Sequence, residues 1–322
     1  MTVAPVRPIT MDEIREARER IKGTILRTPL VRLQLGSDAP EIWLKLENLQ
    51  PINAYKLRGA ANAVALLSDE ARRRGVWTIS AGNAGQGVAY AARAAGVPCS
   101  VVVIETAPQA KKDRMEALGA KLIPVPFDVA WAAMDDRAFP GIDATFVHPF
   151  DDHDFIAGNA TVGLEILEDL PNVAVVIGAI GGGGLITGLG SSIKALKPDT
   201  LIYGAEPETA APAALSFAQG SPQEFTQWQH SFVDGAGGKS MFPRMWQRMS
   251  GLVDGSIVVT LDETKRAMKL MADKARIISE GAGALALAAA LTGKLGRGPI
   301  VAVVSGGNID LAKYCELIAS AG

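Results

Sequence analysis

Charge of one sign, cysteine, histidine and long apolar runs are all scarce in this chain of 322 residues. The formal net charge is −2, which gives no electrostatic reason to expect a nucleic-acid partner. The two cysteines, Cys99 and Cys315, and the three histidines show no metal-ligand spacing, so we expect free thiols and no metal site. No apolar run is long enough to span a bilayer, and the N-terminal segment lacks the apolar stretch of a signal peptide. These absences predict a cytoplasmic protein that binds neither membrane nor nucleic acid.

Apolar residues are abundant, at 48% of the chain, and they follow a regular pattern. Short β-branched runs alternate with longer segments of helical periodicity, which predicts mostly parallel sheets covered by helices, an α/β fold. The expected strands are 41–47, 76–80, 99–105, 121–126, 173–180, 200–206, 256–260 and 299–305. The expected helices are 10–23, 59–75, 85–96, 107–119, 160–170, 185–197, two between 261 and 296, and one at the C-terminal end. Residues 220–250 fit neither pattern and are interpreted as a flap over the site.

Ligands of such folds bind where strands end and helices begin. The stretch "VAVVIGAIGGGGLITG", residues 173–188, places four glycines between a buried strand and a helix. Backbone N–H groups and the helix dipole make this a phosphate-binding loop, although a plain tight turn is the alternative. Gly182, Gly184 and Gly188, with Glu206 at the end of the next strand, also approximate a nicotinamide-dinucleotide fingerprint. That hypothesis is weaker, because Thr187 stands where the third glycine is required.

Two more small-residue loops and one lysine complete the set. "SAGNAGQG", residues 80–87, offers the Asn83 and Gln86 amides, and "VVSGGN", residues 303–308, places Ser305 at a strand end. In "PINAYKLRGAANA", Lys56 lies among apolar and small residues two positions before Arg58. Desolvation and a neighbouring cation would both lower the pKa of the Lys56 amine, although an ordinary lysine at a helix start is the alternative. Together these features suit a phosphorylated cofactor that an amine holds covalently.

Several longer motifs then identify a family. "RTPLV", "WLKLENLQP", "AYKLRGA", "SAGNAGQGVAYAA", "AGNATVGLEIL", "GGGGLITG", "AEPE", "ISEGAGALALAA" and "VVSGGNID" occur in this order along nearly the whole chain. The sequence resembles the fold-type II pyridoxal-phosphate enzymes of the threonine/serine dehydratase and serine racemase group. The resemblance implies a tryptophan synthase beta-like fold with a large domain (1–74 and 149–322), an inserted small domain (75–148), and a homodimer. It also implies α,β-elimination from a β-hydroxy-α-amino acid, which yields a 2-keto acid and ammonia.

The resemblance also assigns roles to residues. Lys56 matches the lysine that forms the Schiff base with pyridoxal 5'-phosphate, and Tyr55 the residue beside the ring. Asn83 is expected to bind the phenolic oxygen, Ser305 to meet the pyridine nitrogen, and Glu280 to border the site. The phosphate is expected to bind backbone N–H groups of Gly181, Gly182, Gly183, Gly184 and Leu185. The substrate is expected to contact Ser80, Gly82, Asn83, Ala84 and Gly238.

Four positions depart from the pattern of the family. Ala84 stands where a histidine is usual, and Gly238 aligns approximately with a serine of serine racemase, which predicts a roomier site and a bulky substrate such as phenylserine. Ala81 replaces the second loop serine of the racemases, which favours elimination over racemisation. Pro212 stands where the metal site of the family has an acidic residue. A serine racemase-type isomerase, an NAD(P)-dependent oxidoreductase and a non-catalytic ligand-binding relative remain the alternatives.

Overall fold

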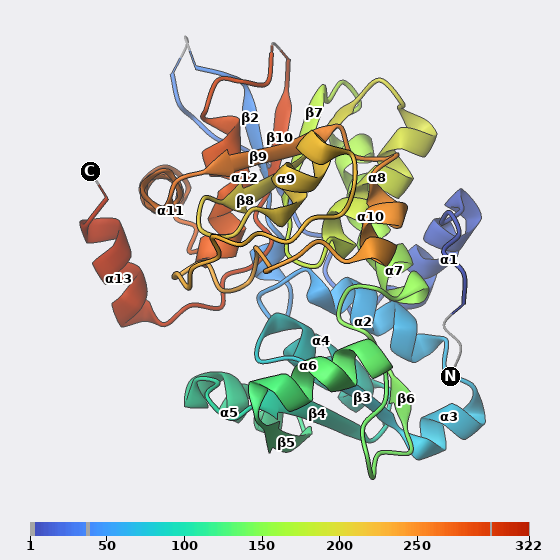
Figure 1. Ribbon diagram of the computed structural model, residues 1–322. Coiled ribbons are helices and arrows are strands. Elements are labelled where there is room, and N and C mark those ends of the chain that lie inside the picture. Colours follow the sequence, from blue (N-terminus) through green and yellow to red (C-terminus); the bar gives the residue numbers. More distant parts are fainter. Residues whose placement is uncertain (1–3, 37–38, 297, 322) are drawn as a thin grey trace.

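Two separate β-sheets organise the chain in the computed structural model, which describes residues 4–36, 39–296 and 298–321 (Figure 1). One sheet has six strands in the order β1-β2-β10-β7-β8-β9, and the other has four in the order β5-β4-β3-β6. Every pairing is parallel except the antiparallel pair β1–β2. The strands are β1 (Leu30–Arg32), β2 (Ile42–Lys45), β3 (Val76–Ile79), β4 (Cys99–Ile104), β5 (Lys121–Val125), β6 (Thr145–Phe146), β7 (Val175–Ala179), β8 (Leu201–Pro207), β9 (Gly255–Val259) and β10 (Ile300–Val303).

Helices cover both sheets and fill the space between them (Figure 1). They are α1 (Met11–Ile21), α2 (Lys56–Ala65), α3 (Asp69–Arg74), α4 (Asn83–Ala94), α5 (Gln109–Ala117), α6 (Phe127–Asp136), α7 (His153–Asp169), α8 (Gly184–Leu196), α9 (Pro212–Gln219), α10 (Pro243–Met249), α11 (Leu261–Ala275), α12 (Gly281–Ala290) and α13 (Leu311–Ala319), with a short 3-10 helix at Glu47–Leu49. None of the helices formed by the described residues is both long and apolar enough to cross a membrane.

Most of the predicted elements are present, and the differences are helix ends and several elements that the sequence did not predict, among them β1 and β6. Thr10 and Glu13 form the capping box that starts α1. The helix predicted over 59–75 is wrong as one element: α2 already begins at Lys56, and the chain breaks before α3, where the Ser68 hydroxyl accepts a hydrogen bond from the Ala71 N–H. The sequence did not predict α6, α9 or α10, because Pro126, Pro212 and Pro243 open these helices within segments of weak periodicity.

The two sheets belong to two α/β domains. The four-stranded sheet uses only strands between Val76 and Phe146, and in Figure 1 it lies below the six-stranded sheet, with α2 and α7 between them. Helix α2 packs closely on α4, because a Cβ on Gly87 would lie 3.2 Å from the backbone of Lys56. We keep the boundary of the small domain at 75–148 as a prediction.

Candidate active site

The glycine loop after β7 is shaped by a phenylalanine that the sequence analysis overlooked. A Cβ on Gly182 would lie 2.2 Å from the Phe150 ring, and one on Gly184 would lie 3.1 Å from the Phe150 carbonyl oxygen. Gly183 has a φ of 90°, a left-handed conformation that favours glycine. Gly181, Gly182 and Gly183 lie in a loop. Among the backbone hydrogen bonds that the loops of the described residues form, none is donated by the N–H groups of these three glycines. The loop therefore presents free donors at the N-terminus of α8, and Leu185 follows in its first turn.

The segment that joins β6 to α7, residues 147–152, connects this loop to Lys56. The Lys56 Nζ donates to the carbonyl oxygen of Pro149 at 2.6 Å and lies 5.2 and 5.5 Å from the ring centroids of Tyr55 and Phe155. The next residue, Phe150, supports the glycine loop. The lysine and the phosphate-binding loop predicted from the sequence are therefore neighbours.

Burial lowers the pKa of the Lys56 amine to about 7. The sequence analysis also expected a contribution from Arg58, and that expectation is wrong. The Arg58 side chain turns away and bonds Glu47 and Glu165 in a fully buried cluster of charges. Desolvation by its apolar and aromatic surroundings is thus the cause of the shift at Lys56.

The loop after β10 lies against the residues that lead into α2. The Tyr55 N–H donates to the Ser305 carbonyl oxygen at 3.0 Å, and Ala54 pairs with Gly306 in a β-bridge. Burial raises the pKa of the Tyr55 hydroxyl, and the charge of Glu280 adds to this. The Ser305 residue is only 4% exposed and directly precedes Gly306 of this bridge. The loop after β10 therefore places Ser305 next to Tyr55 and the start of α2.

Asn83 opens α4 and contacts Glu280 on the opposite domain. Its Nδ2 donates to the Glu280 Oε1 at 2.7 Å. The pKa of Glu280 is raised to about 7, mainly by burial and secondly by the negative charge of Asp234. A side chain at Gly306 would collide with this pair, since its Cβ would lie 2.3 Å from the Glu280 Oε1. Asn83, Ser305 and Lys56 are thus brought to one place, and Glu280 borders it.

The residues predicted to bind substrate differ in how open they are. Ser80 accepts a hydrogen bond from the Gly82 N–H at 3.0 Å, and nothing lies within 4 Å of a Cβ on Gly82. Gly238 is also open, with only the Ser240 backbone near its Cβ direction, at 3.5 Å and beyond. It follows a segment whose Gly237 N–H bonds Ile180, beside the glycine loop. Ala84, in contrast, is buried in the first turn of α4, at 5% exposed, and the space that it leaves for substrate stays a prediction.

The remaining polar candidates are engaged elsewhere. Both carboxylate oxygens of Glu206 are used, by the N–H groups of Ala213 and Ala214 at the start of α9 and by Ser256, and burial raises its pKa to about 7. That arrangement leaves no free acid for the ribose of a dinucleotide. His148 accepts hydrogen bonds from the linking segment, and burial lowers its pKa to about 3. No group of three or more His, Cys, Asp or Glu in the described chain has metal-binding geometry.

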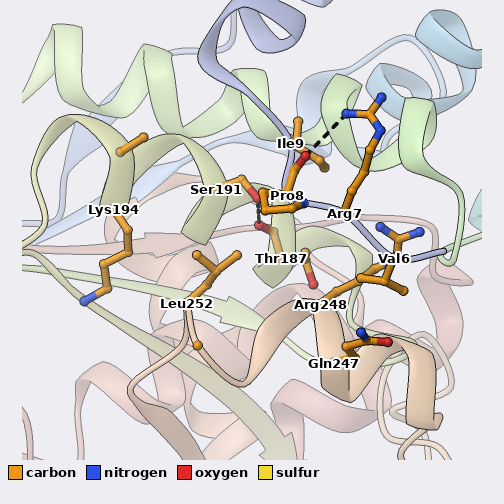
Figure 2. A pocket seen from close by; sticks show the side chains of 12 residues that line it. Val6, Arg7, Pro8, Ile9, Thr187, Ser191, Lys194, Gln247, Arg248 and Leu252 are labelled. Atoms are coloured by element: carbon orange, nitrogen blue, oxygen red, sulfur yellow. Dashed lines mark hydrogen bonds between the residues drawn. The ribbon is translucent and has the colours of Figure 1, made fainter.

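A cavity of about 560 Å³ lies away from these residues, between the N-terminal segment, α8 and the end of α10 (Figure 2). Three cationic side chains line it, and each has a carboxylate partner: Arg7 pairs with Glu13, Lys194 with Asp254, and Arg248 with Asp151. The cavity contains none of the residues predicted for the active site and has no unpaired charge to select an anion.

The residues present fit pyridoxal phosphate. The glycine loop has free N–H donors and no room for side chains, which suits a phosphate group. Ser305 brings a hydroxyl-bearing, largely buried residue next to Tyr55, and the amine of Lys56 has a pKa near neutrality. These three features are what the phosphate, the ring nitrogen and the aldehyde of the cofactor need.

Comparison with known proteins agrees with this geometry. Residues 21–306 match the family described as pyridoxal-phosphate dependent enzyme. The chain is 38% identical to a catabolic L-threonine dehydratase of Staphylococcus aureus, over 99% of this chain and 94% of that protein. It is 39% identical to an L-threonine ammonia-lyase of Thermotoga maritima, over 96% and 78%. The serine racemase of Dictyostelium discoideum has a similar structure, with a TM-score of 0.86 and 33% identity over 94% of this chain and 99% of that one. The chain therefore belongs to the family of pyridoxal-phosphate-dependent enzymes, and pyridoxal 5'-phosphate is its cofactor.

Proposed function

We propose that the protein is a dehydratase and ammonia-lyase that converts a β-hydroxy-α-amino acid to a 2-keto acid and ammonia. The nearly full-length similarity to a threonine dehydratase and a threonine ammonia-lyase carries this proposal. In the reaction the substrate loses its Cα proton and its β-hydroxyl group as water, and hydrolysis of the remaining enamine releases ammonia. When bound, the cofactor supplies the electron-withdrawing ring that makes the Cα proton acidic.

The side chains of this protein support that chemistry. The Lys56 amine has a pKa of about 7, so a large fraction is neutral near neutral pH and able to accept the Cα proton. Gly181 to Leu185 would hold the phosphate of the cofactor through backbone N–H groups, and Asn83 would donate to its ring oxygen. Ser305 would offer the ring nitrogen a hydroxyl, which brings no negative charge to keep a proton there. Ser80, Gly82 and Asn83 receive the substrate carboxylate.

Elimination is favoured over racemisation because Ala81 brings no acid or base to the loop that faces the substrate. Racemisation needs a proton donor on the face opposite Lys56, and the methyl group of Ala81 cannot supply one. Chiral chromatography of substrate recovered after partial turnover measures the two outcomes together. We expect keto acid to form with little of the opposite enantiomer, and racemisation as fast as keto-acid release would support the isomerase alternative.

The substrate that we propose is a bulky β-hydroxy amino acid, with phenylserine as the leading candidate. Gly238 leaves open space, and the neighbouring Lys239 Nζ lies 5.6 and 5.0 Å from the ring centroids of Phe127 and Trp228. Both rings are exposed, at 54% and 37%. An aryl substituent would therefore find volume at Gly238. A pocket difference of this size changes kcat/KM by about 10- to 200-fold.

The substitution Gly238→Ser tests the role of this space. Gly238 has no positive φ and no close neighbour, so a serine fits without strain. We expect phenylserine to be used at least as well as threonine by the wild type, and the variant to lose the preference for phenylserine. Gly251→Ser is the matched control, because Gly251 also has open surroundings but lines the remote cavity. A strong wild-type preference for threonine that Gly238→Ser leaves unchanged would refute the assignment.

We further propose that the enzyme acts as a homodimer in the cytoplasm. The resemblance to the dehydratase group supports the dimer, and light scattering on the purified protein tests it. Cys99 and Cys315 are free thiols, which is typical of a reducing compartment.

A further inference from the structure

Four polar side chains form a chain of hydrogen bonds that crosses between the two domains. Arg114 Nη1, on α5, donates to the Asn308 Oδ1 at 2.7 Å. Asn308 Nδ2 donates to the Asn83 Oδ1 at 2.8 Å, and Asn83 Nδ2 donates to the Glu280 Oε1 at 2.7 Å. Arg114 and Asn83 belong to the domain of the four-stranded sheet, whereas Asn308 follows β10 and Glu280 precedes α12 in the other domain. Consecutive residues of this hydrogen-bonded series therefore belong to alternate domains.

The direction of each hydrogen bond in this chain is determined by groups that have only one role. A guanidinium only donates, so Asn308 must turn its oxygen toward Arg114. A backbone carbonyl only accepts, and Asn308 Nδ2 also donates to the Ile52 carbonyl oxygen at 2.8 Å. Both ends of the Asn308 amide are thereby fixed, and its NH2 group faces Asn83. Asn83 must then accept through its oxygen, so its own NH2 group faces Glu280 and Gly306.

The orientation of the Asn83 amide matters because its two ends have opposite polarity. One N–H of its NH2 group is used by Glu280, and the other remains to donate to a ligand oxygen. A flipped amide would present an oxygen instead and would repel an anionic acceptor. Asn308 and Glu280 are 6% and 5% exposed, so water has little access to compensate for a wrong orientation.

We propose that Asn308 and Arg114 are positioning residues that hold the Asn83 amide in the orientation that donates to the ring oxygen of bound pyridoxal phosphate. This inference rests on the proposed role of Asn83. Because the chain alternates between domains, the orientation also depends on the two domains being in contact at α5. Lys111, one turn earlier on that helix, forms an ion pair with Asp234 and holds the same side of α5.

Two measurements on the holoenzyme and its cofactor-depleted form test the proposal. One is the dissociation constant of pyridoxal phosphate, from titration of the depleted enzyme. The other is the pH at which the visible absorption of the bound cofactor changes, since a donor to the ring oxygen stabilises the deprotonated chromophore. Asn308→Asp keeps the shape and the acceptor for Arg114 but cannot donate to Asn83. Loss of one hydrogen bond of this kind changes affinity by about 3- to 10-fold.

We expect Asn308→Asp to weaken cofactor binding by about 3- to 10-fold. The pH midpoint should rise by the equivalent of the same factor, about 0.5 to 1 pH unit. Arg114→Met should act in the same direction but less strongly, and Arg114→Lys, which restores a donor, should lie closer to the wild type. Lys112→Met is the matched control, because it removes a half-buried cation from α5 that bonds the Glu105 carbonyl oxygen and takes no part in the chain of hydrogen bonds. It should change neither quantity.

Asn83→Ala separates failure of this inference from failure of the proposed function. If Asn83→Ala leaves affinity and spectrum unchanged, the proposed role of Asn83 is wrong. If it changes both while Asn308→Asp and Arg114→Met behave like Lys112→Met, Asn83 binds the cofactor but is not positioned by this chain. Should Asn308→Asp fail to fold through loss of the Ile52 contact, Arg114→Met decides, since Arg114 lies on an exposed face of α5.

Discussion

Among residues near the active site that are not assigned to cofactor or substrate, Arg58 should be the one whose replacement by methionine destabilises the fold most. Arg58 is fully buried, and its guanidinium bonds Glu47 at 2.8 Å twice and Glu165 at 2.7 and 2.8 Å. Burial alone would lower its pKa, but the two carboxylates outweigh this and raise it. Methionine fills a similar volume without charge, so the substitution removes the cation and leaves packing largely intact.

The magnitude follows from which carboxylate loses its partner. Lys45 stays 2.5 Å from Glu165, so Glu47 is the group left with the weaker compensation. Removing one partner of a buried ion pair costs about 3–5 kcal/mol. Against a total stability of about 5–15 kcal/mol, this is a large fraction. Since Arg58 lies two residues after Lys56 on α2, the loss should also disturb the position of the lysine and lower kcat.

Urea unfolding followed by circular dichroism measures the effect, with holoenzyme in each case. The double variant Arg58→Met with Glu47→Gln should recover part of the loss, because it removes the unpaired charge. Arg15→Met is the control: Arg15 pairs with Asp12 on the exposed face of α1, and its loss should cost less than about 1 kcal/mol. If Arg58→Met also costs less than about 1 kcal/mol, the buried cluster adds no net stability and the reasoning fails.

Three further predictions concern the lysine and the domain contact. Lys56→Ala should lower keto-acid formation by at least about 10²- to 10⁴-fold with an unchanged circular dichroism spectrum, and near-wild-type turnover would refute the assignment of Lys56. In the cofactor-depleted enzyme, the rate at which an acylating reagent labels Lys56, followed by mass spectrometry, should rise through a midpoint near pH 7, because burial lowers the pKa of this amine; a midpoint near the ordinary 10.5 would contradict this. Asp151→Asn should cost about 1.5–3 kcal/mol at neutral pH, because Asp151 accepts charge-assisted bonds from Arg137, Arg244 and Arg248. Burial would raise the pKa of Asp151, but the arginines outweigh this and lower it below 3.8. The extra stability of the wild type over Asp151→Asn is therefore present above that pH and is lost as the pH falls further. A stability difference that stays the same in acid would exclude this cause.

The sequence by itself determined the parts of the protein whose signals are local. A strand, a run of glycines and a helix follow one another along the chain at residues 173–197, so this strand–loop–helix unit could be predicted without knowing its neighbours. The same holds for the alternation of strands and helices, and for Lys56 among apolar and small residues. Helices that open at a proline inside weakly periodic segments, such as α6 and α10, could not be predicted in this way.

Only the tertiary structure decided where side chains from distant segments point. Arg58 is close to Lys56 in sequence, yet its guanidinium is held by Glu47 and Glu165, so desolvation alone lowers the pKa of the lysine. Ala84 and Gly238 look equally small in the sequence, but Ala84 is buried in the first turn of α4, whereas a Cβ on Gly238 would meet only the Ser240 backbone. The orientation of the Asn83 amide depends on hydrogen bonds from residues hundreds of positions away, and no local pattern of residues carries that information. Packing of segments that are distant in the sequence fixes these directions, because each buried donor or acceptor has to find its partner on another segment.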